Sequence, residues 1–185
     1  MKHLFRLFAF VLMLAVAGSC ATKKTVYFDQ LIRQNVESYD IQMTDIQFYN
    51  SKEIILERDL SYEETKVASG KIRFENGRFI ERIIIKKETP GVCEGFDNEV
   101  IDVAFEPGEN KVLKFVRDAQ DKYRISAIEW KNKYGKVAYD TTHYFIVPGG
   151  EKAILKVKLE DIYKFDKKQR VATGRTIQKK TSSEE

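Results

Sequence analysis

Residues 71–88, KIRFENGRFIERIIIKKE, hold the clearest structural signal in the chain. Two runs rich in isoleucine, phenylalanine and arginine flank the dipeptide Asn76-Gly77. A two-residue type I′ turn needs a positive φ at both central residues, and Asn-Gly is the pair that favours it most strongly. The stretch therefore predicts a β-hairpin, and with it an antiparallel sheet.

Similar strand-like runs continue after this hairpin. Residues 99–116 repeat the pattern around a turn at Pro107-Gly108, and residues 123–130 and 135–147 are typical of further strands. A third turn is predicted at the Pro-Gly-Gly sequence of residues 148–150, because proline fixes φ near −65° and glycine leaves φ free.

The last predicted strand, within residues 152–165, alternates most clearly. Apolar side chains fall on one face and lysines on the other, which indicates that one face is in water. The apolar residues are Ala153, Leu155, Val157 and Leu159, and the lysines are Lys156 and Lys158. With about nine to eleven short strands and no helix–strand alternation, the fold class is predicted as all-β, an antiparallel sandwich or barrel.

The segment before the first strand, residues 26–40, is ambiguous. An apolar stripe through Leu31 and Val36, with Asp29 as N-cap, fits a short helix. An irregular lead-in fits equally well. The domain organisation expected after a signal at residues 1–19 is a tether at 20–25, one β-rich domain at 26–177 and a disordered polar tail at 178–185.

Charge argues against a nucleic-acid partner. The 185 residues include 32 Lys and Arg and 28 Asp and Glu. Two of the basic residues precede residue 20, so the remaining chain carries 30 basic against 28 acidic side chains. These charges alternate along the sequence, whereas nucleic-acid binders usually present a basic stripe or patch.

An apolar run near the start ends close to Cys20, one of only two cysteines. The run extends without interruption from Leu7 to Gly18 and follows Lys2 and Arg6. As a helix it would measure about 18 Å, at about 1.5 Å per residue, while a bilayer core is about 30 Å thick. The run therefore suits the h-region of a secretory signal.

Residues 17–20, Ala-Gly-Ser-Cys, resemble the lipobox of bacterial lipoprotein precursors. The resemblance implies that residues 1–19 are a lipoprotein signal peptide and that Cys20 becomes lipidated and anchors the chain to membrane lipid. The chain departs from the family at Ala17, where leucine is most common. Ala21, in place of aspartate, implies the outer membrane, with the domain facing the periplasm. The alternative is an ordinary secretory signal that leaves Cys20 as a free thiol.

A second resemblance covers short motifs in the middle of the chain. TPGV at 89–92, FEPG at 105–108 and GKVAYD at 135–140 look like a pattern found in uncharacterised envelope lipoproteins of Bacteroidetes-type bacteria. It implies no particular activity.

Residue types that carry chemistry form no recognisable set. His143 is the only histidine after residue 19, and on a strand it would point away from Asp140. A zinc site needs three or four ligands. Cys93 lies in a glycine-rich stretch and is predicted to be a buried thiol in a turn. No catalytic or phosphate-binding motif is present, so we predict no enzyme, no metal and no cofactor.

Aromatic side chains among charged residues are the remaining candidate site. Tyrosine and tryptophan are enriched at protein interfaces, because they combine a large apolar area with a polar tip. The predicted interface residues are Trp130, Tyr134, Tyr139 and Tyr144. The alternative assigns them to a sandwich core and to strand faces.

Two functions follow from these observations. The first is a non-enzymatic, membrane-anchored envelope lipoprotein that binds a protein partner. The second is a carrier of a small hydrophobic ligand or lipid, held inside a barrel or in a sandwich cleft.

Overall fold

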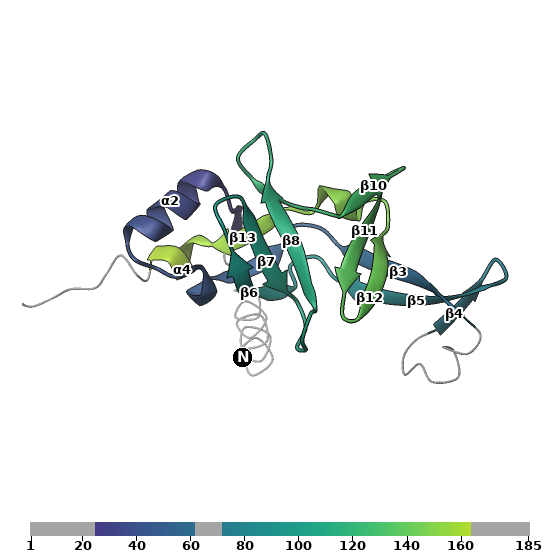
Figure 1. Cartoon of the computed structure of the whole chain (residues 1–185). Helices are drawn as coiled ribbons and strands as arrows, with labels where there is room; N and C mark the ends of the chain where they lie inside the picture. Colours follow the sequence, from purple (N-terminus) through teal and green to yellow (C-terminus); the bar gives the residue numbers. More distant parts are fainter. Residues whose placement is uncertain (1–24, 62–71, 164–185) are drawn as a thin grey trace, which may run out of the picture.

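The structure, a computed structural model, describes residues 25–61 and 72–163, which form two antiparallel sheets packed as a sandwich (Figure 1). The prediction of an all-β sandwich is confirmed, and the barrel alternative is wrong for the described residues. Thirteen strands occur there, more than the predicted number. Three of them have only three residues, too few to show an alternating pattern.

The seven-stranded sheet has the order β1-β13-β2-β6-β7-β8-β9. It therefore places the first and last described strands side by side. Its strands are β1 (Thr25–Tyr27), β13 (Leu155–Lys158), β2 (Gln47–Asn50), β6 (Pro90–Phe96), β7 (Val100–Ala104), β8 (Val112–Arg117) and β9 (Tyr123–Ile125).

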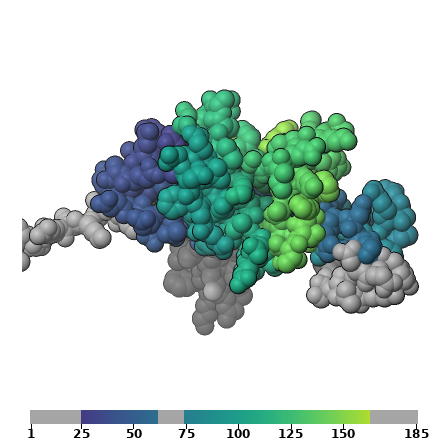
Figure 2. All heavy atoms as spheres, viewed as in Figure 1, coloured from purple at the N-terminus to yellow at the C-terminus, as the bar shows by residue number. Residues whose placement is uncertain are grey.

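The six-stranded sheet has the order β10-β11-β12-β3-β5-β4. Its β4–β5 hairpin extends to the end of the molecule opposite the first helix (Figure 2). Its strands are β10 (Glu129–Lys131), β11 (Tyr134–Tyr139), β12 (Thr142–Ile146), β3 (Ile54–Leu60), β5 (Arg78–Ile85) and β4 (Ile72–Glu75). The helical segments are α2 (Gln30–Ser38), η2 (Met43–Asp45), η3 (Gly150–Lys152) and α4 (Leu159–Tyr163).

Strand β9 joins the two ends of the seven-stranded sheet. The N–H of Ile125 donates to the carbonyl of Ala153 at 2.9 Å, and the N–H of Tyr123 donates to the carbonyl of Phe28 at 3.4 Å. These contacts are isolated bridges, such as Arg124 with Ile154, and not a continuous ladder. The sheet thus curls until its edges touch without forming a closed barrel.

The curled sheet encloses an aromatic cluster. Phe28, Phe48 and Tyr123 are fully buried. The ring centroids of Phe28 and Phe48 are 5.1 Å apart in an edge-on arrangement, and those of Phe28 and Tyr123 are 5.4 Å apart. Such pairs add to the free energy gained from burial alone.

Helix α2 lies against this cluster and confirms the predicted short helix. The Asp29 carboxylate caps it by accepting from the N–H of Ile32 at 2.9 Å. Arg33 is buried, with Nε bound to Glu37 at 2.8 Å and Nη1 bound to the Tyr123 hydroxyl at 2.9 Å. Burial lowers the pKa of Arg33, but these hydrogen bonds outweigh it, and the pKa is raised overall.

The predicted turns are confirmed in position. Asn76 and Gly77 have φ of 50° and 78°, as a type I′ turn requires. Gly108 and Gly149, each following a proline, have φ of 128° and 108°.

Two local predictions are wrong. The alternating pattern predicts Leu159 in the last strand, but Leu159 begins α4, so its side chain does not continue the alternating face. Cys93 is buried, as predicted, but it lies within strand β6 and not in a turn. A bulge between Cys93 and Gly95 shifts the pairing of β6 with β7. The bulge explains why a glycine-rich sequence resembling a turn can remain in a sheet.

Replacing Phe48 with alanine should lower the free energy of unfolding by about 3–5 kcal/mol, because it empties the centre of the aromatic cluster. Urea denaturation measures this change. The control is Phe74→Ala, whose side chain is 67% exposed. Similar losses in the two variants would contradict the assignment of Phe48 to the core.

Candidate functional site

The structure separates the four predicted interface aromatics. Tyr139 and Tyr144 are only 1% and 4% exposed, and their ring centroids lie 6.0 Å apart in the core. Their prediction as interface anchors is therefore wrong. Tyr139 and Tyr144 lie on the inner faces of β11 and β12, whereas Lys136 and His143 lie on the outer faces, because successive side chains of a strand alternate.

Trp130 and Tyr134 lie on opposite faces of the β10–β11 hairpin. Trp130 is paired with Gly135, and Tyr134 with Lys131. Paired residues share a face, so Trp130 covers Gly135. A Cβ added at Gly135 would come within 2.6 Å of the Trp130 ring. Trp130 and Tyr134, which are 39% and 46% exposed, cannot form one continuous patch.

Tyr134 instead shares the outer face of the six-stranded sheet with Phe145, a residue that the sequence analysis did not select. Phe145 is 45% exposed and is paired with Lys136 on one side and Glu57 on the other. His143 lies two residues earlier on the same face and is exposed. We call the set Glu57, Asp59, Arg78, Tyr134, His143 and Phe145 the outer-face surface.

Two adjoining hollows shape the outer-face surface. The larger, about 600 Å³, lies over β3, β5 and β12, and the smaller, about 330 Å³, lies over β10 and β11. Tyr134 and Phe145 line both, so these two aromatic side chains form the ridge between them. A ridge flanked by hollows is a shape that a complementary surface can grip.

Paired charges lie on one side of the aromatic ridge, over β3 and β5. Arg82 binds Glu57, with its Nε at 2.5 Å, and Arg78 Nη1 binds the Asp59 carboxylate at 2.9 Å. The Arg78–Asp59 pair is exposed, whereas the Arg82–Glu57 pair is half-buried, and exposed ion pairs contribute little to folding stability. They do hold acidic and basic groups at defined places on the surface, which favours selectivity between partners.

On the inner face of the same sheet, the buried Tyr144 belongs to a polar cluster whose other members, Arg58 and Glu81, are half-buried. Its hydroxyl donates to Glu81 at 2.9 Å, and the same carboxylate oxygen accepts from Arg58 Nε at 2.6 Å. Burial and the bond to Glu81 raise the pKa of Tyr144 to about 12. The phenol therefore stays neutral and acts as a fixed donor.

The candidate chemical residues do not assemble into a reactive site. Cys93 is buried, and burial raises the pKa of its thiol. His143 is paired with Ala138, while Asp140 lies in the turn between β11 and β12. Within residues 25–61 and 72–163, no group of three or more His, Cys, Asp or Glu could hold a metal ion.

Comparisons of the chain with protein-family models, with curated proteins and with solved structures found no match. No helix in the described part of the chain is long and apolar enough to cross a membrane. Cys20 and the signal segment lie outside the described residues.

Tyr144→Phe should lower the free energy of unfolding at pH 7 by about 1 kcal/mol, because the bond to Glu81 is lost. The folded-state pKa is raised above the unfolded value of about 10, so this stabilisation is full below pH 10 and disappears as pH rises towards 12. Urea denaturation from pH 7 to 11.5 should show the difference between wild type and variant shrinking above pH 10. Tyr39→Phe, at an exposed tyrosine, is the control. A pH-independent difference would contradict the role of Tyr144.

Proposed function

We propose that the protein is a membrane-anchored envelope lipoprotein that binds a partner protein through the outer-face surface. It acts without catalysis, as an interaction or assembly module. The observation that carries the proposal is the ridge of Tyr134 and Phe145, half-exposed between two hollows on one sheet face.

The composition of the surface supports a protein partner. Interfaces combine aromatic side chains near the centre with a polar rim, and a few aromatic residues supply most of the affinity. In the outer-face surface, Tyr134 on β11 and Phe145 on β12 lie beside the ion pairs that join β3 to β5. A fitting partner presents apolar side chains to the ridge and polar groups to the charged pairs.

The packing of the core bears on the alternative function, a carrier of a hydrophobic ligand. Large side chains such as Phe28, Phe115 and Tyr139 fill the space within and between the sheets. A lipid carrier needs an apolar cavity large enough for an acyl chain. An apolar slot of about 360 Å³, lined by Leu113 and Val137 among others, lies at the edge of the core and is partly open.

The membrane anchor in this proposal is Cys20, inferred from the lipobox-like residues 17–20. Two or more acyl chains hold a protein stably at a bilayer, since each buried methylene contributes about 0.8 kcal/mol. An anchored module meets its partner at the membrane surface, and this favours binding at modest affinity.

Replacing Cys20 with serine should abolish labelling of the protein by radioactive palmitate and move it from the membrane to the soluble fraction. Cys93→Ser is the matched control, because it removes the buried cysteine instead. Equal membrane partitioning of the Cys20→Ser variant and the wild type would contradict the anchor.

Tyr134→Ala combined with Phe145→Ala should reduce partner capture by at least about tenfold, as expected when central aromatic residues are lost. Covalent cross-linking in intact cells, followed by quantitative mass spectrometry, measures the capture. Tyr39→Ala combined with Phe74→Ala removes the same residue types from exposed positions elsewhere and should have no effect. Equal capture by the two double variants would refute the proposed surface.

A further inference from the structure

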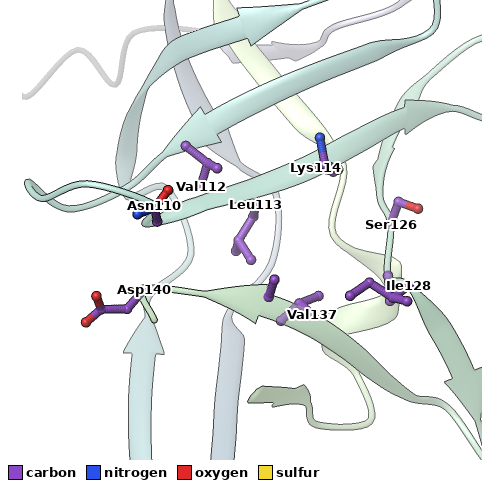
Figure 3. Close-up of a pocket in the computed structure, with 10 residues that line it drawn as sticks. Asn110, Val112, Leu113, Lys114, Ser126, Ile128, Val137 and Asp140 are labelled. Carbon is purple, nitrogen blue, oxygen red and sulfur yellow. The ribbon is translucent and has the colours of Figure 1, made fainter. Parts of the chain in front are cut away.

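A slot opens where β8 of the seven-stranded sheet lies next to β11 of the six-stranded sheet (Figure 3). Its volume of about 360 Å³ falls at the lower end of the usual range for ligand pockets, about 300–1,000 Å³. The lining is mostly apolar, with Leu113 and Val137 on the core side and Ile128 at the rim. Ile128 is the most exposed of these three, although it is a large apolar residue.

Backbone polar groups point into the slot from both walls. The backbone carbonyl of Lys114 accepts from the N–H of Ser126. Alternate residues of a strand direct their backbone groups to the same edge, so the N–H and C=O of Val112 also point toward the slot. On the opposite wall, the backbone carbonyl of Lys136 accepts from the N–H of Ile128. Because backbone groups of alternate residues point to the same edge, the N–H and C=O of Ala138 also point toward the slot.

Neither wall has a strand partner across the slot. Strand β9 pairs with β8 only from Phe115 to Arg117, and β10 pairs with β11 only from Tyr134 to Lys136. In the described part of the chain, no ladder joins β8 to β11. Val112 is half-buried and Ala138 is exposed, so their unpaired backbone groups are accessible to a ligand. Free N–H and C=O groups along a strand edge can pair with the backbone of an added peptide.

Both ends of the slot are closed by hydrogen bonds. The N–H of Asp140 donates to the carbonyl of Asn110 at 2.8 Å at one end, and the N–H of Ser126 donates to the carbonyl of Lys114 at 2.8 Å at the other. The open length between them is about three residues, and a long strand cannot lie along it. The slot suits a compact molecule with donors and acceptors on opposite edges and one apolar group.

We propose that this slot binds a single peptide unit that carries one branched apolar side chain, as in an acylated amino-acid amide or a very short peptide. Its N–H and C=O groups pair with the backbones of Val112 and Ala138, and its side chain packs on Leu113 and Val137. The site is separate from the outer-face surface, because the two share no residue. It therefore stands whether or not the partner surface is correct.

The test is a titration of the full chain, in detergent micelles, with N-acetyl-leucine-methylamide. Nuclear magnetic resonance monitors the backbone amide signals during the titration. The amides of Val112 and Ala138 should shift saturably. Ala138→Trp, which places a large ring at the mouth, should weaken binding at least about tenfold, a difference of about 1.4 kcal/mol. Ala119→Trp, in the exposed turn between β8 and β9, should leave binding unchanged.

Three outcomes would overturn the proposal: no saturable shift at Val112 and Ala138, equal binding by both tryptophan variants, or equally tight binding of octanoate at the same amides. The last result would indicate an apolar site with no use for the peptide groups. If Ala138→Trp fails to fold, Ile128→Ser, at the exposed rim of the slot, replaces it in the titration. Binding by the Ile128→Ser variant as tight as that of the wild type would refute ligand binding in the slot. Tyr134→Ala with Phe145→Ala should not change this titration.

Discussion

The return of β9 to the first and last described strands, β1 and β13, is the constraint on which the rest of the fold depends. Only a short set of backbone bonds makes this connection, including those from Ile125 to Ala153 and from Gln30 to Asp121. They bring Phe28 over Tyr123 and seat α2 across the open end of the sheet, where Arg33 reaches the Tyr123 hydroxyl. Residues about 90 positions apart thereby share one hydrogen-bonded cluster.

The second sheet separates its roles by face. Along β12 the side chains alternate between the core and the outside, with Tyr144 and Ile146 inward and His143 and Phe145 outward. The inward tyrosine is held by Glu81 and Arg58, so it can add rigidity without adding surface. The outward pair leaves aromatic area available beside ion pairs that contribute little to stability.

Local sequence patterns predicted the sandwich, the short helix and the turns, because each depends on neighbouring residues. Asn76-Gly77 and the Asp29 cap are examples. The candidate site was predicted only in part. Alternation shows that Tyr144 and Phe145 face opposite ways, but not which of them faces the core, since that depends on strands distant in sequence. The buried Arg33 was missed for the same reason, because its partner Tyr123 comes from β9.

The meeting of the seven-stranded sheet's two edges also bears on aggregation. An exposed strand edge carries a row of free N–H and C=O groups that can recruit a strand from another molecule. Here β9 is bonded to Phe28 and Ala153 next to β1 and β13, so the edges occupy each other. The described residues of this sheet thus offer little template for fibril growth.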